Sequence, residues 1–524
     1  MRKALSLYLI LVMALSMLSS VFAHAEGLPE YCEITVEVFD RGNVGGTDPT
    51  NNYYTDWIKQ KVLEELNIGV SFVAVSRWEE ETQLNNLMAA GTAPDISFTY
   101  NNDMITNFGE QGGLVDLTPY IDQGMLSNLQ AFLGPDPQKP GFGMIYRNQN
   151  KDTGVTWSIP ARRMNVAQIN TFIRKDWLDK LGLPLPTTTE EYVDALRAFK
   201  AMDPAEAGVT SIIPYTSTDD IRYRAGNLLE SFIDPDISNR DRWVNTVVDR
   251  LFLLPGYKEG VRLLNQMYNE GLLDPEFPLY TDDVTCDNQI KSGAAGSFSH
   301  NWDQPFRESP GLLKDLRINV PDAEIVAIDP FVNAAGKTQK MLYPSVGLNF
   351  FIPIFSKNPE AAVRYANWLA KFENRYYLQI GDEGVTHEMI NGLPKMLTVE
   401  GEKIMNSNQN IDYTFMINGL DVNDPDRYGE ALANSYTVDP KLIEDAYAYA
   451  MKDGRPAVVV PGVNIISAGE VAATLIDKGK TLMAQSITAK PEDFDKVWDD
   501  GIADWLASGA QEVLAENAEK YYEP

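Results

Sequence analysis

The sequence predicts an α/β protein with more than one domain. The chain has 524 residues, which is longer than a single hydrophobic core usually supports. Strand and helix patterns alternate between residues 34 and 100, and the alternation resumes after Pro160. The composition, 44% hydrophobic and 23% charged, is that of a globular protein and not of a disordered one.

The first part of the predicted fold has the spacing of βαβ units. In order, the pattern indicates a strand at residues 34–39, a helix at 51–67 that Gly69 ends, a strand at 70–75, a helix at 78–90 and a strand at 95–100. Ligands of parallel sheets bind beyond the carboxyl ends of the strands. The loops at 40–48, 76–78 and 100–103 are therefore the first candidates for a binding site.

The pattern restarts beyond Pro160. Thr188 and Glu191 form a predicted capping box for a helix that runs through Lys200. Asn358 and Pro359 start another helix as its N-cap and first-turn residues. The remaining predicted elements are strands at 166–173, 293–298 and 323–328, a helix at 256–270 and a mostly helical tail from 468 to 522.

The first 25 residues are typical of a secretory signal peptide. Arg2 and Lys3 precede an apolar run that is short for a membrane span, and Ala23 and Ala25 mark a cleavage site after Ala25. The residues before Cys32 do not fit a lipid-attachment motif. We therefore expect an exported protein that is extracellular, cell-surface-associated or periplasmic, and soluble after cleavage.

The charge balance excludes some classes of partner. The chain has 44 basic and 74 acidic residues and a formal net charge of −30. Removal of the signal peptide takes away two basic residues and no acid, which makes the charge −32. Such a surface repels phosphate backbones and anionic lipid headgroups, so we expect no nucleic-acid partner.

Two cysteines and three histidines limit the available chemistry. A disulfide scaffold and a Cys-rich zinc module are both excluded. Cys32 and Cys286 can pair in an oxidising compartment or remain two small buried thiols, and we favour the buried thiols. We expect no metal and no cofactor.

Six short segments follow one another in a specific order along the chain. They are residues 89–96 (AAGTAPDI), 112–121 (GGLVDLTPYI), 173–183 (IRKDWLDKLGL), 186–191 (PTTTEE), 356–368 (SKNPEAAVRYANW) and 381–384 (GDEG). Each is weak alone, but their joint order behind a signal peptide is specific. On these segments the chain resembles the extracellular solute-binding proteins (family 1) of sugar-type ABC importers, in particular the large subfamily of alginate- and oligosaccharide-binding proteins.

The resemblance implies a periplasmic-binding-protein-like fold, in which a hinge joins two discontinuous α/β lobes and the ligand cleft lies between them. After the signal peptide (1–25), we expect an N-terminal lobe from 26–165 and 346–382. The C-terminal lobe then comprises 166–345 and 383–524, with a helical C-terminal extension. Hinge crossings are expected near 161–167 and 342–347 and after the turn at 381–384.

One departure from the family concerns calcium. Many relatives carry an acidic loop rich in Gly and Asn after the helix that ends in Phe-Lys, here Phe199 and Lys200. In this chain only Asp203 and Glu206 could supply carboxylates there. Calcium takes six to eight oxygen ligands, so we expect no calcium site.

The resemblance also guides the choice of ligand-binding residues, because aromatic platforms and planar polar groups recognise sugars. In this family a Trp after the small-residue strand commonly stacks on the ligand, which implies this role for Trp302; a buried interdomain aromatic is the alternative. The helical patterns assign Trp177 and Trp368 to packing. The full set of candidates is Trp302, Asn301, Asp303, Trp78, Tyr100, Asn101, Asn102, Trp157, Arg162 and Arg163.

The charge of the ligand stays open at this point. Arg162 and Arg163 at the first crossing could hold a sugar carboxylate, although interdomain salt bridges are the commoner role of such arginines. The large negative charge favours a neutral sugar unless a local basic site overrides it.

We expect a monomeric receptor that captures a sugar or oligosaccharide by lobe closure and delivers it to the permease subunits of an ABC transporter. It is not expected to be an enzyme. The alternative is a secreted carbohydrate-active enzyme, either a glycosidase or a lyase. The chain lacks the Gly-x-Ser-x-Gly, His-Glu-x-x-His and P-loop motifs, although 74 acidic residues leave room for the carboxylate pair of a glycosidase.

Overall fold

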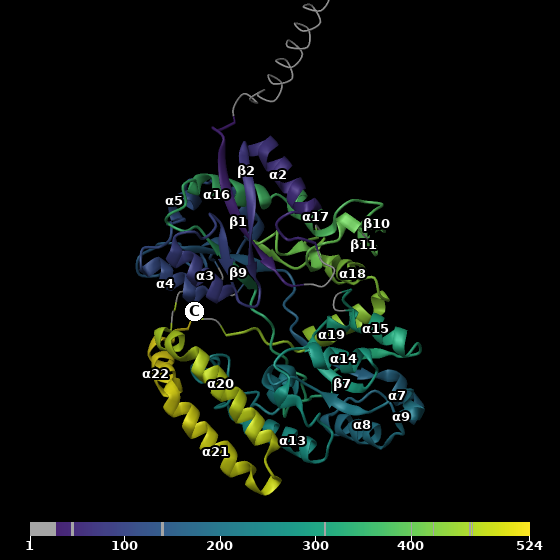
Figure 1. The fold of residues 1–524 in the computed structure, drawn as a ribbon. Helices are drawn as coiled ribbons and strands as arrows, with labels where there is room; N and C mark the ends of the chain where they lie inside the picture. Colours follow the sequence, from purple (N-terminus) through teal and green to yellow (C-terminus); the bar gives the residue numbers. More distant parts are fainter. Residues whose placement is uncertain are drawn as a thin grey trace, which may run out of the picture.

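The chain folds into two lobes, each with a central β-sheet covered by helices (Figure 1). The computed structural model describes residues 28–42, 47–137, 141–308, 311–399, 401–422, 424–458, 460, 463 and 465–523. The predicted signal peptide and residues 43–46 of the first candidate loop lie outside this range.

The sheet of the first lobe is mixed. Parallel pairing joins β1 (Cys32–Asp40) to β2 (Ile68–Ser76), and a parallel bridge from Val36 to Ile96 connects β1 to the start of β3 (Ser97–Thr99). Beyond β3 the order continues with β9 (Val346–Phe351), which pairs antiparallel with both β3 and β4 (Ser158–Arg163). Strand β12 (Ile417–Asn418) pairs parallel with β4 at the edge of the sheet. The three predicted parallel strands are therefore confirmed, whereas β9 enters between β3 and β4 from far along the chain.

Helices on both sides of this sheet complete a core that contains Phe98, Phe350 and Trp368. They are α2 (Tyr53–Leu66), α3 (Glu80–Ala90), α4 (Asn102–Glu110), α5 (Thr118–Asp122), α6 (Ser127–Leu133), α16 (Pro359–Leu369) and α17 (Phe372–Ile380). Helix α2 ends at Leu66, and its C-cap is Asn67 and not Gly69. Asn67 adopts the left-handed conformation (φ 56°) and its amide donates to the Leu63 carbonyl, so the C-cap comes two residues earlier than the sequence suggested.

The sheet of the second lobe has the order β6 (Ile213–Thr216), β7 (Ala295–Asn301), β5 (Ile169–Arg174) and β8 (Ile325–Ile328). Strand β7 is the predicted strand of small residues. A Cβ on Gly296 would approach the rings of Phe199 and Trp177 to 2.7 and 2.8 Å, so only glycine lets these two rings pack against the sheet.

The helices of the second lobe include the predicted C-terminal extension. They are α7 (Lys175–Leu181), α8 (Thr189–Ala201), α9 (Pro204–Ala207), α10 (Ile221–Arg224), α11 (Gly226–Glu230), α12 (Asn239–Val244), α13 (Tyr257–Asn269), α14 (Val284–Lys291), α15 (Leu312–Asn319), α18 (Tyr428–Asn434), α19 (Pro440–Met451), α20 (Ile466–Thr488), α21 (Phe494–Trp505) and α22 (Gln511–Lys520). The capping box of Thr188 and Glu191 is present at α8. The buried Asn265 in α13 donates to the carbonyls of Ser486 and Ile487, which holds the end of α20 on the lobe.

Three chain segments connect the lobes and lie side by side. The Arg163 amide donates to the Ser345 carbonyl (2.9 Å), and the Met164 amide donates to the Asn418 carbonyl (2.8 Å). The Tyr343 amide donates to Val166 (2.9 Å). The hinge therefore consists of three extended segments tied by backbone hydrogen bonds.

The third connecting segment begins later than the turn at 381–384. Tyr413 and Phe415 pack in the core of the first lobe, and β12 pairs with β4 of the same lobe. The hairpin of β10 (His387–Ile390) and β11 (Leu393–Met396) precedes this segment. We propose that the first lobe extends to Asn418, beyond the boundary expected at 382.

Both cysteines are free thiols; Cys286 is buried, as expected, whereas Cys32 is only half-buried. Cys32 begins β1 in the first lobe, and Cys286 is buried in α14 of the second. Burial raises the pKa of the Cys286 thiol to about 11, so it stays protonated at neutral pH. Among the described residues, no helix has the length and apolar character that crossing a bilayer requires.

Candidate functional site

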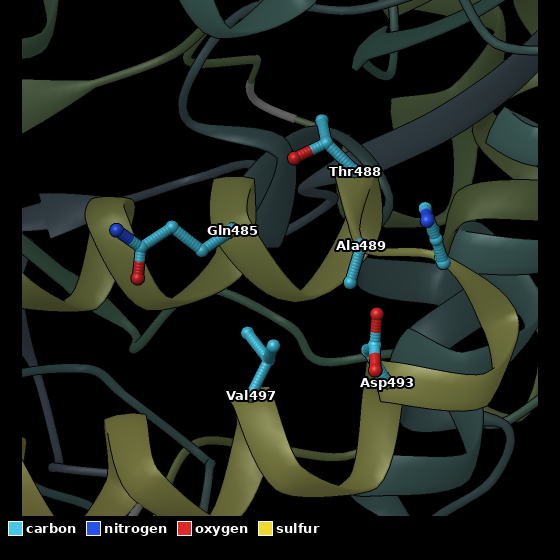
Figure 2. A pocket seen from close by; sticks show the side chains of 6 residues that line it. Gln485, Thr488, Ala489, Asp493 and Val497 are labelled. Carbon is cyan, nitrogen blue, oxygen red and sulfur yellow. The ribbon is translucent and has the colours of Figure 1, made fainter.

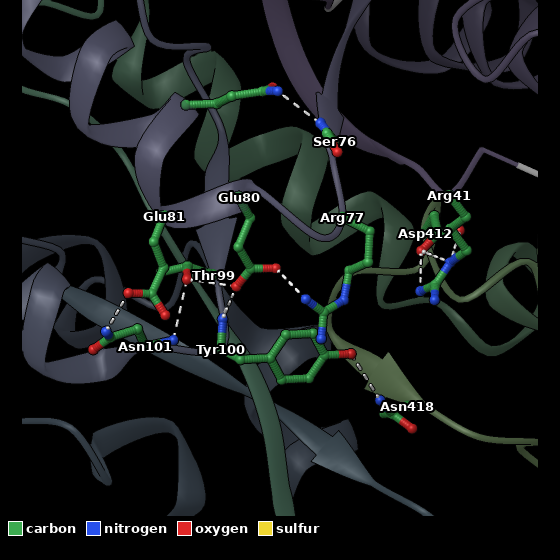
Figure 3. A network of polar contacts seen from close by, with 11 residues as sticks. Arg41, Ser76, Arg77, Glu80, Glu81, Thr99, Tyr100, Asn101, Asp412 and Asn418 are labelled. Atoms are coloured by element: carbon green, nitrogen blue, oxygen red, sulfur yellow. Dashed lines mark hydrogen bonds and ion pairs between the residues drawn. The ribbon is translucent and has the colours of Figure 1, made fainter. Parts of the chain in front are cut away.

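The loops that follow β1, β2 and β3 meet, as the sequence indicated. The Arg77 amide donates to the Asp40 carbonyl (2.8 Å), which joins the first two loops. The Arg77 guanidinium lies 4.5 Å from the centre of the Tyr100 ring, which joins the second loop to the third. This face of the first lobe therefore carries a stacked cation and tyrosine at the ends of adjacent strands (Figure 3).

Glu80 fixes the orientation of this stack. The carboxylate is 5% exposed; one oxygen accepts from the Thr99 hydroxyl and the Tyr100 amide, and the other accepts from Arg77 at 2.8 Å (Figure 3). A buried carboxylate with three donors is fully satisfied and rigid. Tyr100 is thus held at both its backbone and its ring, which leaves its hydroxyl as the group available for contact.

The Tyr100 hydroxyl reaches the hinge. It accepts a hydrogen bond from the Asn418 side chain (3.3 Å; Figure 3). Asn418 in turn pairs with Arg163 across β12 and β4. Asn418 also packs tightly against the chain at Gly347, where an added Cβ would lie 3.3 Å from the Asn418 Cβ. The third strand of the first lobe and two of the three connecting segments therefore converge at this point.

Arg163 and Tyr343 extend the site toward the second lobe. The guanidinium lies 4.4 Å from the centre of the Tyr343 ring, and its Nε donates to the Val346 carbonyl (3.3 Å). The Tyr343 hydroxyl lies 2.6 Å from that of Tyr223 in α10, and Tyr223 donates to the Asn301 side chain at the end of β7 (3.0 Å). The result is a continuous polar chain from one lobe to the other.

We call these six residues the interlobe cluster: Tyr100, Arg163, Tyr223, Asn301, Tyr343 and Asn418. All six are half-buried. Desolvation lowers the pKa of the Arg163 guanidinium, and the three tyrosines counteract it. Burial also raises the pKa of Tyr223, so its hydroxyl stays protonated and can donate. The cluster offers phenol, amide and guanidinium groups, which suit hydroxyl- and carboxylate-bearing ligands.

His300 lies directly beside the cluster on β7. Its Nδ1 accepts from the Asn301 amide (2.7 Å), which assigns the ring proton to Nε2, and Nε2 lies 3.4 Å from an Asp283 oxygen. Desolvation lowers the pKa of His300 to about 4. The ring is therefore neutral at pH 7, and its contact with Asp283 is not an ion pair there.

Trp302 lies in the core of the second lobe. The residue is 5% exposed, and its ring packs edge-on against Tyr436 and Tyr447 at centroid distances of 6.2 and 5.5 Å. The neighbouring Asp303 is also buried, with Arg307 and the Tyr436 hydroxyl as partners. In this structure Trp302 is thus a buried aromatic within the second lobe and not between the lobes, and its role as a ligand platform stays a prediction.

The other sequence candidates are placed as follows. Trp78 is 74% exposed beside Arg77, and the Trp157 indole packs on Gly109 of α4. The Asn101 side chain caps α4 by accepting from the Met104 amide, and Asn102 accepts from the Ser158 hydroxyl. Arg162 donates to the Phe132 carbonyl within the first lobe. Among the ten candidates, Tyr100, Asn301 and Arg163 belong to the interlobe cluster.

Sequence reasoning missed Tyr223, Tyr343 and Asn418. Tyr343 adjoins the second predicted crossing, so an aromatic residue beside a crossing was an available signal. Tyr223 follows the loop after β6, but no sequence pattern relates it to Asn301. Asn418 was missed because the third connecting segment was expected elsewhere.

Two other regions of the second lobe lack the features of a ligand site. A shallow hollow between α20 and α21 is lined by Gln485, Thr488, Ala489, Lys490, Asp493 and Val497 (Figure 2). It contains one lysine and one carboxylate and no aromatic residue, so it offers little for a ligand. At the loop of Asp203, the carboxylate caps α9 by accepting from the Ala205 amide. Within the described residues, no three His, Cys, Asp or Glu side chains are grouped as metal ligands.

Comparisons of the sequence with known proteins agree with the resemblance. A family model of bacterial extracellular solute-binding proteins matches residues 49–228. The chain is 27% identical over 242 residues to the fructooligosaccharide ABC transporter substrate-binding protein FusA of Streptococcus pneumoniae, covering 42% of this chain and 41% of the relative. It is 24% identical over 247 residues to the polygalacturonan/rhamnogalacturonan-binding protein YtcQ of Bacillus subtilis, covering 46% of each. The matched part thus spans less than half the length of these relatives.

Comparisons of the fold cover nearly the whole chain. The alginate-binding protein AlgQ2, solved without calcium, superposes with a TM-score of 0.62 at 20% identity, over 93% of this chain and 97% of AlgQ2. FusA of S. pneumoniae in complex with kestose superposes with a TM-score of 0.67 at 18% identity, over 93% of this chain and 98% of FusA. At these identities the likeness concerns the fold, and the predicted two-lobe periplasmic-binding-protein-like fold is confirmed. Residues 49–228 thus resemble the bacterial extracellular solute-binding proteins in sequence, and nearly the whole chain shares the two-lobe fold of AlgQ2 and FusA.

Proposed function

We propose that the protein captures an oligosaccharide between its two lobes and delivers it to the permease subunits of an ABC importer. The observation that carries this proposal is the interlobe cluster, in which Tyr100, Arg163 and Tyr223 bring polar groups from both lobes and the hinge to one place. A ligand that touches both lobes favours the closed arrangement over the open one. The names of the curated relatives, which are oligosaccharide- and polysaccharide-binding proteins, support a sugar as the ligand class.

The hinge suits this mechanism. Three extended segments connect the lobes and are tied by backbone hydrogen bonds, such as those from Arg163 to Ser345 and from Tyr343 to Val166. Small changes of φ and ψ in such segments let the lobes rotate as rigid bodies while each core stays packed. In this mechanism the protein acts as a monomer, changes no covalent bond and presents the closed form to the permease.

Export is part of the same proposal. The predicted signal peptide would place the mature protein outside the cytoplasmic membrane, where a receptor for an importer meets its ligand. Fractionation of cells that express the full chain tests this step. The expected product is found outside the cytoplasm and begins at residue 26; a full-length cytoplasmic product contradicts the proposal.

A thermal-shift screen across neutral and acidic oligosaccharides tests the function. A ligand at about one hundred times its Kd stabilises the folded protein by about 2.7 kcal/mol, which raises the Tm by several degrees. Monosaccharides that make up each active glycan serve as length controls. If no saccharide raises the Tm, the receptor proposal fails.

The same samples separate a receptor from a carbohydrate-active enzyme. After prolonged incubation with each active glycan, mass spectrometry is expected to recover the glycan unchanged. Appearance of shorter or unsaturated products would replace the receptor with a glycosidase or a lyase, respectively.

A further inference from the structure

One cation of the interlobe cluster has no counter-charge. The Arg163 guanidinium forms no ion pair with any residue that the structure describes, and its single hydrogen bond runs from Nε to the Val346 carbonyl. Among the described residues, no hydrogen bond reaches its two terminal nitrogens, and neither nitrogen is fully enclosed. Arg163 is thus a half-buried cation with an open hydrogen-bonding edge.

The neighbouring arginines differ from Arg163 in this respect. Four of them lie around the cluster, and each has a carboxylate partner within 2.9 Å: Arg41 with Asp412, Arg77 with Glu80, Arg224 with Asp283 and Arg307 with Asp303. These pairs cancel in charge. Among the described residues, Arg163 is therefore the one of these five arginines whose charge no carboxylate balances. The protein as a whole has a net charge of −30.

The surroundings of Arg163 fix which part of it a ligand can use. Tyr343 covers one face of the guanidinium plane, and Nε is already engaged by Val346. The terminal nitrogens remain, and their parallel N–H groups match the two oxygens of a carboxylate. Leaving a desolvated cation unpaired is unfavourable, so a ligand that supplies an anion gains more here than a neutral ligand of the same shape.

We propose that the saccharide captured by this protein carries a carboxylate and that Arg163 binds this group with its two terminal nitrogens. The inference rests on the proposed receptor function and names the ligand class: an acidic oligosaccharide with a uronate or a sialate residue. The hydroxyls of Tyr100, Tyr223 and Tyr343 then face the sugar hydroxyls around the carboxylate. The net negative charge of the protein does not oppose this binding strongly, because at physiological salt charges farther than about 8 Å are largely screened.

The test uses ligands matched in every respect except the carboxylate. One arm compares trigalacturonate with its carboxyl-reduced galactose trimer, and the other compares sialyllactose with its carboxyl-reduced derivative. Titration calorimetry with the mature protein is expected to give at least about tenfold tighter binding of the acidic member in one arm. The arm that shows this preference identifies the acidic residue of the ligand as a uronate or as a sialate.

Substitutions of Arg162 and Arg163 test whether the preference for the acidic ligand comes from Arg163. In Arg163→Gln the affinity for the acidic member is expected to fall about 30-fold or more, because a charge-assisted pair is lost, while binding of the neutral member changes little. Arg163→Lys should restore part of the preference. Arg162→Gln is the matched control, since Arg162 bonds the Phe132 carbonyl in the first lobe, and it should keep the preference.

The outcomes separate the inference from the function on which it rests. Neutral saccharides that bind as tightly as their acidic partners, or an acidic preference that survives in Arg163→Gln, overturn the role of Arg163 and leave the receptor function standing. Failure of every saccharide to bind the wild-type protein overturns both. Equal Tm values of the wild type and Arg163→Gln without ligand confirm that the variant is folded.

Discussion

The hydroxyl oxygens of Tyr223 and Tyr343 lie 2.6 Å apart. Tyr343 belongs to a segment that connects the lobes, whereas Tyr223 lies in α10 of the second lobe, so this contact attaches the hinge to one lobe. Tyr223 also donates to Asn301. If Tyr223 donates its single proton to Asn301, Tyr343 must be the donor in the shared bond. This ordered chain of donors is the basis of the first prediction.

The tyrosine pair is expected to be energetically coupled. Tyr223→Phe and Tyr343→Phe should each lower the free energy of unfolding by about 1–2 kcal/mol, because each leaves a partly buried polar group without its partner. The double variant should lose less than the sum, with a coupling energy of about 1 kcal/mol. Urea unfolding followed by tryptophan fluorescence measures the three variants. Strictly additive losses would show that the two hydroxyls do not interact.

The indole of Trp157 leaves no room for a side chain at Gly109. A Cβ at this position would overlap the Trp157 ring, so Gly109→Ala should destabilise the first lobe by about 1–3 kcal/mol. Gly469→Ala in α20 is the matched control, since its Cβ would meet nothing within 4 Å and alanine favours the helix. Addition of Trp157→Leu to Gly109→Ala should recover part of the loss. Equal urea midpoints of Gly109→Ala and the wild type would contradict this packing.

The pair of Arg147 and Asp136 is a buried ion pair. The Arg147 side chain is 4% exposed and donates to both Asp136 oxygens at 2.7 and 2.9 Å. Asp136→Asn should therefore cost about 3–5 kcal/mol, because it removes the carboxylate charge that balances a buried arginine. The exposed pair of Lys151 and Asp152 provides the comparison: Asp152→Asn should change stability by less than about 0.5 kcal/mol. Similar effects of the two substitutions would contradict the proposed importance of burial.

Acid should weaken the second lobe through His300. Its pKa is lowered from 6.5 to about 4, so between these values the unfolded chain binds more protons than the folded one. Stability contributed by the neutral ring is complete above pH 6.5 and is lost as the pH falls to 4, by about 3 kcal/mol at most.

The comparison with His300→Gln isolates this effect. Asp287 acts in the opposite direction, since desolvation raises its pKa to about 6, and its protonation stabilises the folded state as the pH falls. Asp283, whose pKa is about 2, loses its stabilising charge only below pH 4. We therefore measure the urea midpoints of the wild type and of His300→Gln from pH 7 to pH 4. The difference between them, wild type minus variant, is expected to decrease as the pH falls. A constant difference would show that His300 does not titrate in this range.

Much of the local structure follows from the sequence. The alternation at 34–39, the periodicity at 51–67 and the capping box at Thr188 and Glu191 predicted elements that the structure contains. These signals are local, because a helix or strand is specified by the spacing of its own apolar residues and by its caps. The burial of Trp177 and Trp368 was predictable for the same reason.

The site was predictable only in part. Tyr100, Asn301 and Arg163 follow strands or crossings, and position in the chain sufficed to choose them. Trp302 occupies an equivalent position, yet it packs in the core against Tyr436 and Tyr447, which come from far along the chain. No local pattern reports whether such distant rings will cover a side chain.

The sequence alone determined the α/β class, which depends on periodicity, and the family resemblance carried by the order of its motifs implied the two-lobe fold. Only the tertiary structure decided that β9 inserts between β3 and β4 and that Asn418 meets Tyr100. It also decided that Arg163 has no carboxylate partner among the described residues while its neighbouring arginines are paired. Ion pairing and burial depend on which distant residues meet in space, and this is set by packing of the whole chain, not by neighbours in sequence.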